Sequence, residues 1–494
     1  MSRRAARAFV GGLGRTLRWA ATGAMALGGL WLLAFGPRAE EAIPPGRVVV
    51  DYWEKWSGRE ADTMRTLVDE FNATVGAEQG IWVRFVSLAQ VDQKMRIATA
   101  AGVPPDVAGL WGEKLSQLAA SDALEPLDAL AAEAGIARDD YKPVYYDDCV
   151  HDGRLVALPT TPATVALLWN KQIFADEAEA LRAAGCDPMR PPRTIEELDR
   201  YAAALDEWET DDLGRRRLVR AGFMPMEPGW FVAHQWRWFG GDIWDTSAPP
   251  ERRLRLTDAR VVAAYEWMAS YGRRLGRPAM GAFAEGDRTL SPQNPFATGK
   301  VAMVQQGPWM AAYLETFAPH MNRARWDKAI ERAMPRERRA ENYVWAAAPF
   351  PAAEGVGAGG PVTVTNLDVV AIPRGARHKR EAFAFIRFLQ RPDVMERLCT
   401  AQCKPSPLAA VSRRFYDEHP NPYIDVFDAL AASPNAHFVT HSPVWPAISV
   451  ELINVAQSAT AGTADPRAAL SAAQARLDLA WARFREERTK RGGT

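Results

Sequence analysis

Cysteine, histidine and net charge are all scarce in this chain of 494 residues. It has 4 cysteines and 7 histidines, and its 60 basic residues balance its 60 acidic residues. A balanced charge gives no electrostatic reason to expect nucleic acid as a partner, so we expect none. The cysteines contain no C-x-x-C pair, which leaves a zinc ribbon or a thioredoxin-like redox site without support.

The sequence motifs of common enzyme classes are absent as well. The chain has no G-x-S-x-G, no H-E-x-x-H and no complete Walker A motif. His437 and His441 have the spacing of metal ligands on a helix, but Ser442 and Pro443 argue against a regular helix there. We interpret them as two surface histidines, and we expect no metal and no cofactor.

The four cysteines leave their pairing open. Cys399 and Cys403 are four residues apart and could form a local disulfide in an oxidising compartment, provided that they lie in a loop. Cys149 and Cys186 could pair with each other or stay free.

The N-terminus has the pattern of an export signal. Arginines at positions 3, 4, 7, 15 and 18 precede an uncharged run at 19–35 that is long enough to span a bilayer. We expect residues 1–36 to be a signal peptide or a retained signal anchor, with 37–46 as a linker. The rest of the chain is then periplasmic or otherwise extracytoplasmic, either free or anchored to the inner membrane through 19–35.

Tryptophan, in contrast, is abundant, with 18 residues. Aromatic rings bring large apolar faces at low entropy cost, so the excess indicates a ring-lined binding surface. Trp236, Trp238 and Trp244 match no motif and are expected in the core.

Strand and helix patterns alternate after residue 47. Val48–Trp53, Ile81–Val86 and Val107–Trp111 are apolar strands, separated by helices around 57–71 and 91–98. Ser57 and Glu60 are expected to form a capping box. This β-α-β-α-β order predicts an α/β fold with a mostly parallel sheet. The tail at 444–485 is expected to be helical, with a break at "TAGTADP".

Four stretches carry a resemblance to a known family. They are "VVVDYWEKWSGREADTMRTLVDEFN", "KMRIATAAGVPPDVAGLWGEKLSQLAASDALEPLD", "GRLVALPTTPATVALLWNKQIF" and "FATGKVAMVQQGPWM". In this order they resemble the extracellular solute-binding proteins of bacterial ABC importers, in particular family 1, the carbohydrate-binding proteins similar to maltose- and glycerol-3-phosphate-binding proteins. The resemblance covers about residues 47–485.

The resemblance implies a two-lobed periplasmic-binding-protein fold of type II with three crossings between the lobes. Lobe one would comprise 47–157 and 350–415, and lobe two 160–349 and 416–490. A carbohydrate, most simply a di- or oligosaccharide, would bind in the cleft and be delivered to the transmembrane subunits of an ABC permease. No enzymatic activity is implied.

Sugar recognition needs a ring to stack on and polar groups for the hydroxyls. Tryptophans beside polar residues at strand ends meet that need, because ligands of open α/β sheets bind beyond the carboxyl ends of strands. The motif matches indicate as ligand-binding residues Trp53, Glu54, Trp111, Glu113, Trp169, Glu227, Trp230, Trp309 and Asn366. The role of Trp56 stays open between a second stacking face and a packing residue.

Three other functions compete with sugar transport. One is a receptor that feeds a signalling partner without transport, which a retained anchor would favour. An exported glycoside hydrolase would use two carboxylates, with Glu54, Glu113 and Glu227 as candidates. A receptor for a ligand of the glycerol phosphate type would need cationic groups in the cleft, and Arg59 and Arg237 lie near the relevant loops.

Overall fold

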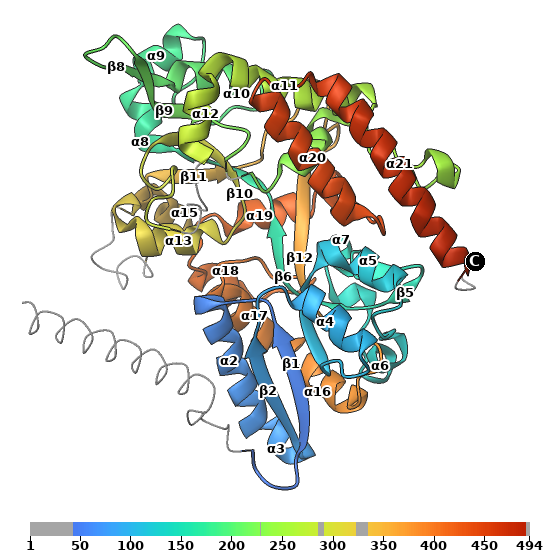
Figure 1. Cartoon of the computed structure of the whole chain (residues 1–494). Coiled ribbons are helices and arrows are strands. Elements are labelled where there is room, and N and C mark those ends of the chain that lie inside the picture. The colour runs from blue at the N-terminus through green and yellow to red at the C-terminus, as the bar shows by residue number, and fades with distance from the viewer. Residues whose placement is uncertain (1–42, 228, 285–290, 323–333, 491–494) are drawn as a thin grey trace, which may run out of the picture. The chain divides into compact units, whose positions relative to one another are not determined.

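A computed structural model describes residues 43–227, 229–284, 291–322 and 334–490 (Figure 1). Val48–Thr494 form one compact unit. The expected export segment at 1–36 lies outside the described residues. Within those residues, no helix is both long enough and apolar enough to cross a membrane.

The first sheet has the strand order β13-β12-β3-β1-β2, and β6 also pairs with β12. Its strands are β1 (Val48–Glu54), β2 (Ile81–Ser87), β3 (Val107–Trp111), β6 (Leu158–Thr164), β12 (Thr363–Ala371) and β13 (Ala436–Phe438). β1 is parallel to both β2 and β3, as the β-α-β-α-β order predicts. β12 is antiparallel to β3 and β6, which makes the sheet mixed.

The second sheet has the order β11-β7-β10-β9-β8. Its strands are β7 (Ala166–Asn170), β8 (Glu207–Thr210), β9 (Arg216–Phe223), β10 (Val301–Gln306) and β11 (Trp345–Ala348). Only β9 and β10 pair in parallel, and the other neighbours are antiparallel. A separate hairpin joins β4 (Val150–His151) and β5 (Arg154–Leu155).

Helices cover the first sheet around one core. They are α2 (Gly58–Ala73), α3 (Val75–Gln79), α4 (Val91–Ala100), α5 (Leu115–Ala120), α6 (Asp128–Glu133), α7 (Pro143–Asp147), α16 (Lys379–Leu389), α17 (Pro392–Ala401) and α18 (Arg413–Glu418). The apolar face of α2 shows why such a segment is helical: Met64, Leu67, Val68 and Phe71 follow the helical period and are all buried.

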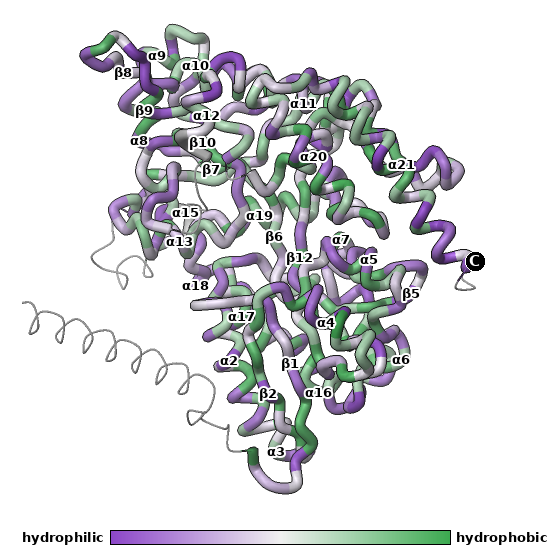
Figure 2. The backbone as a smooth tube through the Cα atoms, viewed as in Figure 1, coloured by the Kyte–Doolittle hydropathy of each residue, from purple (hydrophilic) through white to green (hydrophobic). Residues whose placement is uncertain are grey.

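The second sheet has its own helices and a main core, with a smaller hydrophobic cluster beside it. The helices are α8 (Lys171–Asp176), α9 (Ala178–Ala183), α10 (Ile195–Leu205), α11 (Ala259–Leu275), α12 (Arg277–Ala284), α13 (Met310–Phe317), α15 (Arg336–Arg339), α20 (Trp445–Thr460) and α21 (Pro466–Lys490), and α19 (Ile424–Ala431) contacts both sheets. The break expected in the helical tail is confirmed between α20 and α21. Figure 2 shows the end of α21 near the C-terminus in the purple of hydrophilic residues.

β12 connects the two cores. Its first half places Val364 in the core of the second sheet, and its second half places Val369 in the core of the first. The chain passes between the sheets after β6, between β11 and β12, and again after β13 on the way to α20. The two sheets, each with its own helices, are connected at these crossings. The segments at the crossings therefore lie where a ligand cleft is expected.

Three local features differ from what the sequence predicts. Ser57 is the N-cap residue of α2, but its side chain makes no capping bond and Glu60 faces Lys404 instead, so the predicted capping box is wrong. All four cysteines are buried and none forms a disulfide, so the local disulfide between Cys399 and Cys403 is not present. His437 and His441 are partly buried rather than surface residues.

Candidate functional site

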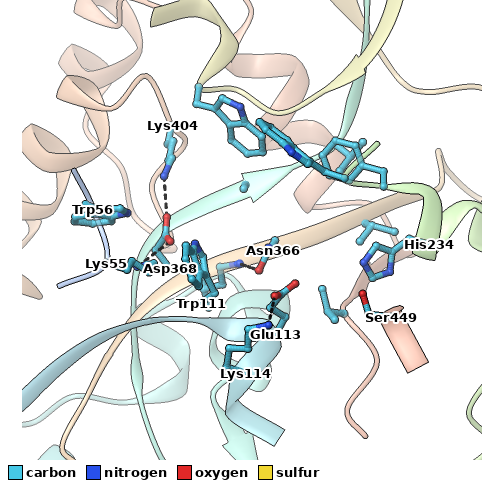
Figure 3. A pocket seen from close by; sticks show the side chains of 18 of the residues that line it. Lys55, Trp56, Trp111, Glu113, Lys114, His234, Asn366, Asp368, Lys404 and Ser449 are labelled. Carbon is cyan, nitrogen blue, oxygen red and sulfur yellow. Dashed lines mark hydrogen bonds and ion pairs between the residues drawn. The ribbon is translucent and has the colours of Figure 1, made fainter. Parts of the chain in front are cut away.

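A cavity of about 630 Å³ opens where segments from both sheets meet (Figure 3). Its volume lies within the usual range for small-molecule sites. Its lining includes Lys55, Trp56, Ser57, Glu60, Trp111, Glu113, Lys114, Trp230, Phe231, His234, Trp309, Tyr313, Asn366, Asp368, Lys404 and Ser449. These residues form two contrasting surfaces.

The first surface, here the charged wall, comprises Lys55, Trp56, Glu60, Trp111, Asp368 and Lys404. Asp368 on β12 is its centre: one carboxylate oxygen lies 3.0 Å from Lys55 Nζ and the other 2.7 Å from Lys404 Nζ. Thr161 on β6 donates its hydroxyl to the same carboxylate at 2.7 Å. Lys404 Nζ also lies 3.4 Å from Glu60. The two ammonium groups are therefore fixed in place before any ligand arrives.

These charges are stable despite their burial because each has a partner. Burial alone would raise the pKa of Asp368, but Lys404 and Lys55 hold it well below its usual range. Burial alone would lower the pKa of Lys404, but the Asp368 carboxylate raises it above its usual value. Asp368 and Lys404 are therefore both ionised at neutral pH.

Two tryptophan rings flank the lysines of the charged wall. Lys55 Nζ lies 4.6 Å from the ring centroid of Trp56 and 5.7 Å from that of Trp111. Lys404 Nζ lies 5.6 Å from the Trp56 ring. Cation–π attraction therefore holds Trp56, which is nearly fully buried, while Trp111 is 37% exposed and offers a ring face to a ligand.

Polar groups continue along the same side of the cavity. Glu113 pairs with Lys114 at 2.8 Å in the 3-10 turn η1 (Gly112–Lys114) that follows β3. Asn366 on β12 accepts a hydrogen bond at its Oδ1 from the backbone N–H of Leu367. Its amide nitrogen can donate to a ligand hydroxyl.

The second surface, here the aromatic wall, comprises Trp230, Phe231, Trp309 and Tyr313. The rings of Trp230 and Trp309 lie 5.8 Å apart, and Trp230 is 40% exposed. Trp309 follows β10 through Gly307 and Pro308. A Cβ on residue 307 would lie 2.1 Å from the Trp309 ring, so only glycine lets this ring fold back over the turn.

His234 adds an uncharged polar group to the cavity. It belongs to the 3-10 helix η3 (Val232–Phe239) and stacks on Trp445 at a centroid distance of 4.9 Å. Burial, reinforced by the positive charge of Arg237, lowers the pKa of His234 to about 3. The imidazole is therefore neutral at neutral pH and can both donate and accept a hydrogen bond.

Five of the nine residues indicated by the sequence line this cavity: Trp111, Glu113, Trp230, Trp309 and Asn366. The other four lie elsewhere. Glu54 is 1% exposed, and its carboxylate accepts hydrogen bonds from the hydroxyl of Tyr52 and from the backbone N–H of Lys55. Trp53 packs against the first core and Trp169 belongs to the second. Glu227 is not among the lining residues.

β1 extends one residue further than the sequence predicts. This explains why Lys55 and Trp56 line the cavity in place of Trp53 and Glu54. The strand ends at Glu54, so the loop that reaches the cavity begins at Lys55. Sequence reasoning also missed Asp368 and Lys404. The sequence does contain an indication of this ion pair, because the apolar stretch "LDVVAIP" holds a single aspartate. A buried carboxylate of this kind needs a cationic partner.

The arrangement suits a neutral ligand that has apolar faces and many hydroxyl groups. Exposed rings on both sides can stack on apolar faces, while fixed carboxylates, ammonium groups and amides can bind hydroxyls. Among the described residues, no group of His, Cys, Asp or Glu is placed to hold a metal ion.

The model of the bacterial extracellular solute-binding protein family matches residues 57–396. The match covers more than half of the sequence. The chain therefore belongs to the bacterial extracellular solute-binding proteins.

Curated relatives match over a shorter stretch. The chain is 26% identical over 184 residues to the sn-glycerol-3-phosphate-binding periplasmic protein UgpB of Pectobacterium atrosepticum, covering 35% of this chain and 37% of that protein. It is 29% identical over 199 residues to the protein of that name from Escherichia coli O1:K1, covering 39% and 41%. The alignments thus span about two fifths of these relatives.

Solved structures show the same two-lobed fold over most of the chain. CpMnBP1 with mannobiose bound superposes with a TM-score of 0.69 and 23% identity, covering 87% of this chain and 99% of that one. The sugar-binding protein MalE of Xanthomonas citri gives 0.66 and 20%, covering 89% and 98%. The GacH receptor of Streptomyces glaucescens gives 0.63 and 19%, covering 87% and 97%.

Proposed function

We propose that this chain is the substrate-binding protein of an ABC importer, and that it captures a neutral di- or oligosaccharide in the cavity described above. The observation that carries the proposal is the pairing of an aromatic wall with a wall of fixed, paired charges. The two-lobed type II fold with three crossings supports closure of the lobes on the ligand by hinge motion. Lobe one would be 47–157 with 350–415, and lobe two 160–349 with 416–490.

The ion pairs that the cavity lysines already make favour a neutral ligand over glycerol phosphate. Each lysine that lines the cavity is already paired with a carboxylate: Lys55 and Lys404 with Asp368, and Lys114 with Glu113. A phosphate would have to compete with these carboxylates and would be repelled by them. Arg237, one of the two arginines considered from the sequence, lies 3.8 Å from Asp242 and is not among the lining residues. Arg59 lines a separate cavity of about 300 Å³.

The role that we propose is binding without catalysis. Of the three glutamates considered for a glycoside hydrolase, only Glu113 lines the cavity, and it is paired with Lys114. The mature chain would work outside the cytoplasm, deliver its sugar to the transmembrane subunits of a permease, and either be released after export or stay anchored through residues 19–35.

A thermal-shift panel tests this proposal. The purified protein is heated with mannobiose, mannotriose, maltose, acarbose and sn-glycerol 3-phosphate, because a ligand that binds only the folded state raises the melting temperature. We expect at least one neutral sugar to raise it and Trp309→Ala to remove that rise. A shift with glycerol phosphate alone would contradict the proposal. Hydrolysis of the stabilising sugar would instead support the enzyme.

A further inference from the structure

A second buried polar cluster lies next to the cavity but outside its lining. His441 donates from Nε2 to the carboxylate of Asp148 at 2.7 Å. The His441 ring packs between that of His151, at a centroid distance of 4.4 Å, and that of Phe438, at 4.3 Å. Asp148 is 3% exposed. A hydrogen bond to a charged group in such a place is strong, and losing it is costly.

The two partners come from different cores. Asp148 directly follows α7, and its neighbours Tyr145 and Cys149 belong to the core of the first sheet. His441 lies between β13 and α20, and its neighbours Val444 and Trp445 belong to the core of the second. The hydrogen bond between Asp148 and His441 therefore joins the two lobes that have to close on a ligand.

The cluster also touches the backbone of the sugar site. Gly112 packs directly on Asp148: a Cβ at residue 112 would lie 2.8 Å from Asp148 Oδ2. Its neighbours Trp111 and Glu113 both line the cavity, and so does Val439, two residues before His441. A shift of the Asp148 carboxylate would thus move the turn that carries one stacking face and one carboxylate.

The charged and titratable groups around the pair are few. His151 donates from Nε2 to the backbone carbonyl of Asp148 at 3.1 Å and contacts Ser116 Oγ at 3.4 Å through Nδ1. Burial, and then the charge of His441, lower the pKa of His151 to about 4, so this ring is neutral at neutral pH. Cys149 is buried beside Asp148, and burial raises the pKa of its thiol far above its usual value, so it stays uncharged. Asp152 faces His151 and Arg488.

Asp148 carries a cost of its own. Burial raises the pKa of this carboxyl, and its bond to His441 only partly reverses that effect. A carboxyl whose pKa is raised in the folded state stabilises the fold below its unfolded pKa and loses that contribution as the pH rises through the folded value. Above that folded value the buried charge lowers stability, and its bond to His441 offsets part of this cost.

We propose that Asp148 and His441 are positioning residues of the sugar site, whose hydrogen bond holds the turn at Trp111–Glu113 in its binding geometry and so contributes to the affinity for the sugar. The effect on affinity rests on the function proposed above, whereas the effect on the turn does not. Loss of this bond would free the Asp148 carboxylate on which Gly112 packs, so the turn should loosen.

Four variants test the hydrogen bond. His441→Ala removes the donor, whereas His441→Gln puts an amide donor in its place. Asp148→Ala removes the acceptor, and the double variant His441→Ala with Asp148→Ala completes a thermodynamic cycle that isolates the pair. His320→Ala, at an exposed histidine, is the matched control for histidine loss.

Two measurements at pH 7 test the proposal. Hydrogen exchange of the ligand-free protein follows the peptide that covers 110–116, and calorimetry follows the affinity for the neutral sugar that stabilises the wild type most. We expect His441→Ala and Asp148→Ala to exchange faster in this peptide than the wild type and to bind the sugar about two- to thirtyfold more weakly. His441→Gln should restore part of both properties, and His320→Ala should behave as the wild type.

The two proposals fail in different ways. If exchange at 110–116 is the same in the wild type, in His441→Ala and in Asp148→Ala, the positioning role is overturned whether or not a sugar binds. If no sugar binds the wild type while exchange at 110–116 responds as expected, the proposed function fails and the positioning of the turn stands.

Discussion

The two walls of the cavity are held in place by different forces. In the charged wall, Asp368 fixes Lys55 and Lys404 at hydrogen-bonding distance, and the lysine side chains are only 1% and 5% exposed. In the aromatic wall, Trp230 and Trp309 are placed by packing and by the turn at Gly307, and their rings remain accessible. The charged wall should therefore matter most for the fold, and the aromatic wall most for the ligand.

The largest effect is expected from breaking the charged wall with Asp368→Asn. The change leaves two buried ammonium groups without their shared carboxylate, which should lower the free energy of unfolding at pH 7 by about 3–5 kcal/mol. Chemical denaturation measures it. Asp393→Asn, which removes an exposed ion pair to Arg391, is the matched control and should cost less than about 1 kcal/mol.

The pH dependence of that difference follows from the lowered pKa of Asp368. A carboxyl with a lowered pKa stabilises the fold above its unfolded pKa of about 3.9 and loses this contribution as the pH falls toward the folded value. The stability gap between the wild type and Asp368→Asn should therefore be constant from pH 7 to about pH 5 and shrink below about pH 4. A gap that widens on acidification would show that Asp368 is not held ionised by the lysines.

An intermediate effect is expected from truncating the aromatic wall. Trp230→Ala and Trp309→Ala each remove a stacking face and should weaken sugar binding about 10- to 100-fold, measured by calorimetry. Trp208→Ala, in the hairpin of β8 and β9, removes a partly buried tryptophan that does not line the cavity and serves as the control. Equal losses in all three variants would mean that general destabilisation, not stacking, weakens binding.

The smallest effect is expected from Trp56→Phe. Phenylalanine keeps an aromatic face between Lys55 and Lys404 but attracts cations less, so affinity should fall by about 0.5–1 kcal/mol, roughly two- to fivefold. Trp53→Phe is the comparison, because Trp53 lies on β1 before the cavity begins. A larger effect at residue 53 than at residue 56 would restore the original assignment of the ligand loop.

The order of strands and helices could be predicted from the sequence because it depends on repeated patterns of apolar residues. The alternating strands and helices from Val48 to Trp111 follow periods of two and 3.6 residues, and each of those elements is present. Two of the four residues of the aromatic wall, Trp230 and Trp309, were also among those indicated by the sequence. Gly307 and Pro308 mark the turn that leaves Trp309 outside the strand, whereas Phe231 and Tyr313 match no motif.

The charged wall was not readable in the same way. It depends on the exact residue at which β1 ends. It also depends on the ion pairs of Asp368 with Lys55 and with Lys404, and these three residues come from separate parts of the chain. Neither strand ends nor long-range pairs follow from local periodicity. The hydrogen bond between Asp148 and His441 could not be predicted for the same reason, because 293 residues separate its partners.

Calorimetry of the wild-type protein with mannobiose, maltose and sn-glycerol 3-phosphate, side by side at pH 7, tests the central claim most directly. Two opposed walls, one of exposed rings and one of charges already paired with each other, predict saturable binding of a neutral sugar and no measurable heat from glycerol phosphate. Tight binding of glycerol phosphate, with no response to any neutral sugar, would contradict the account.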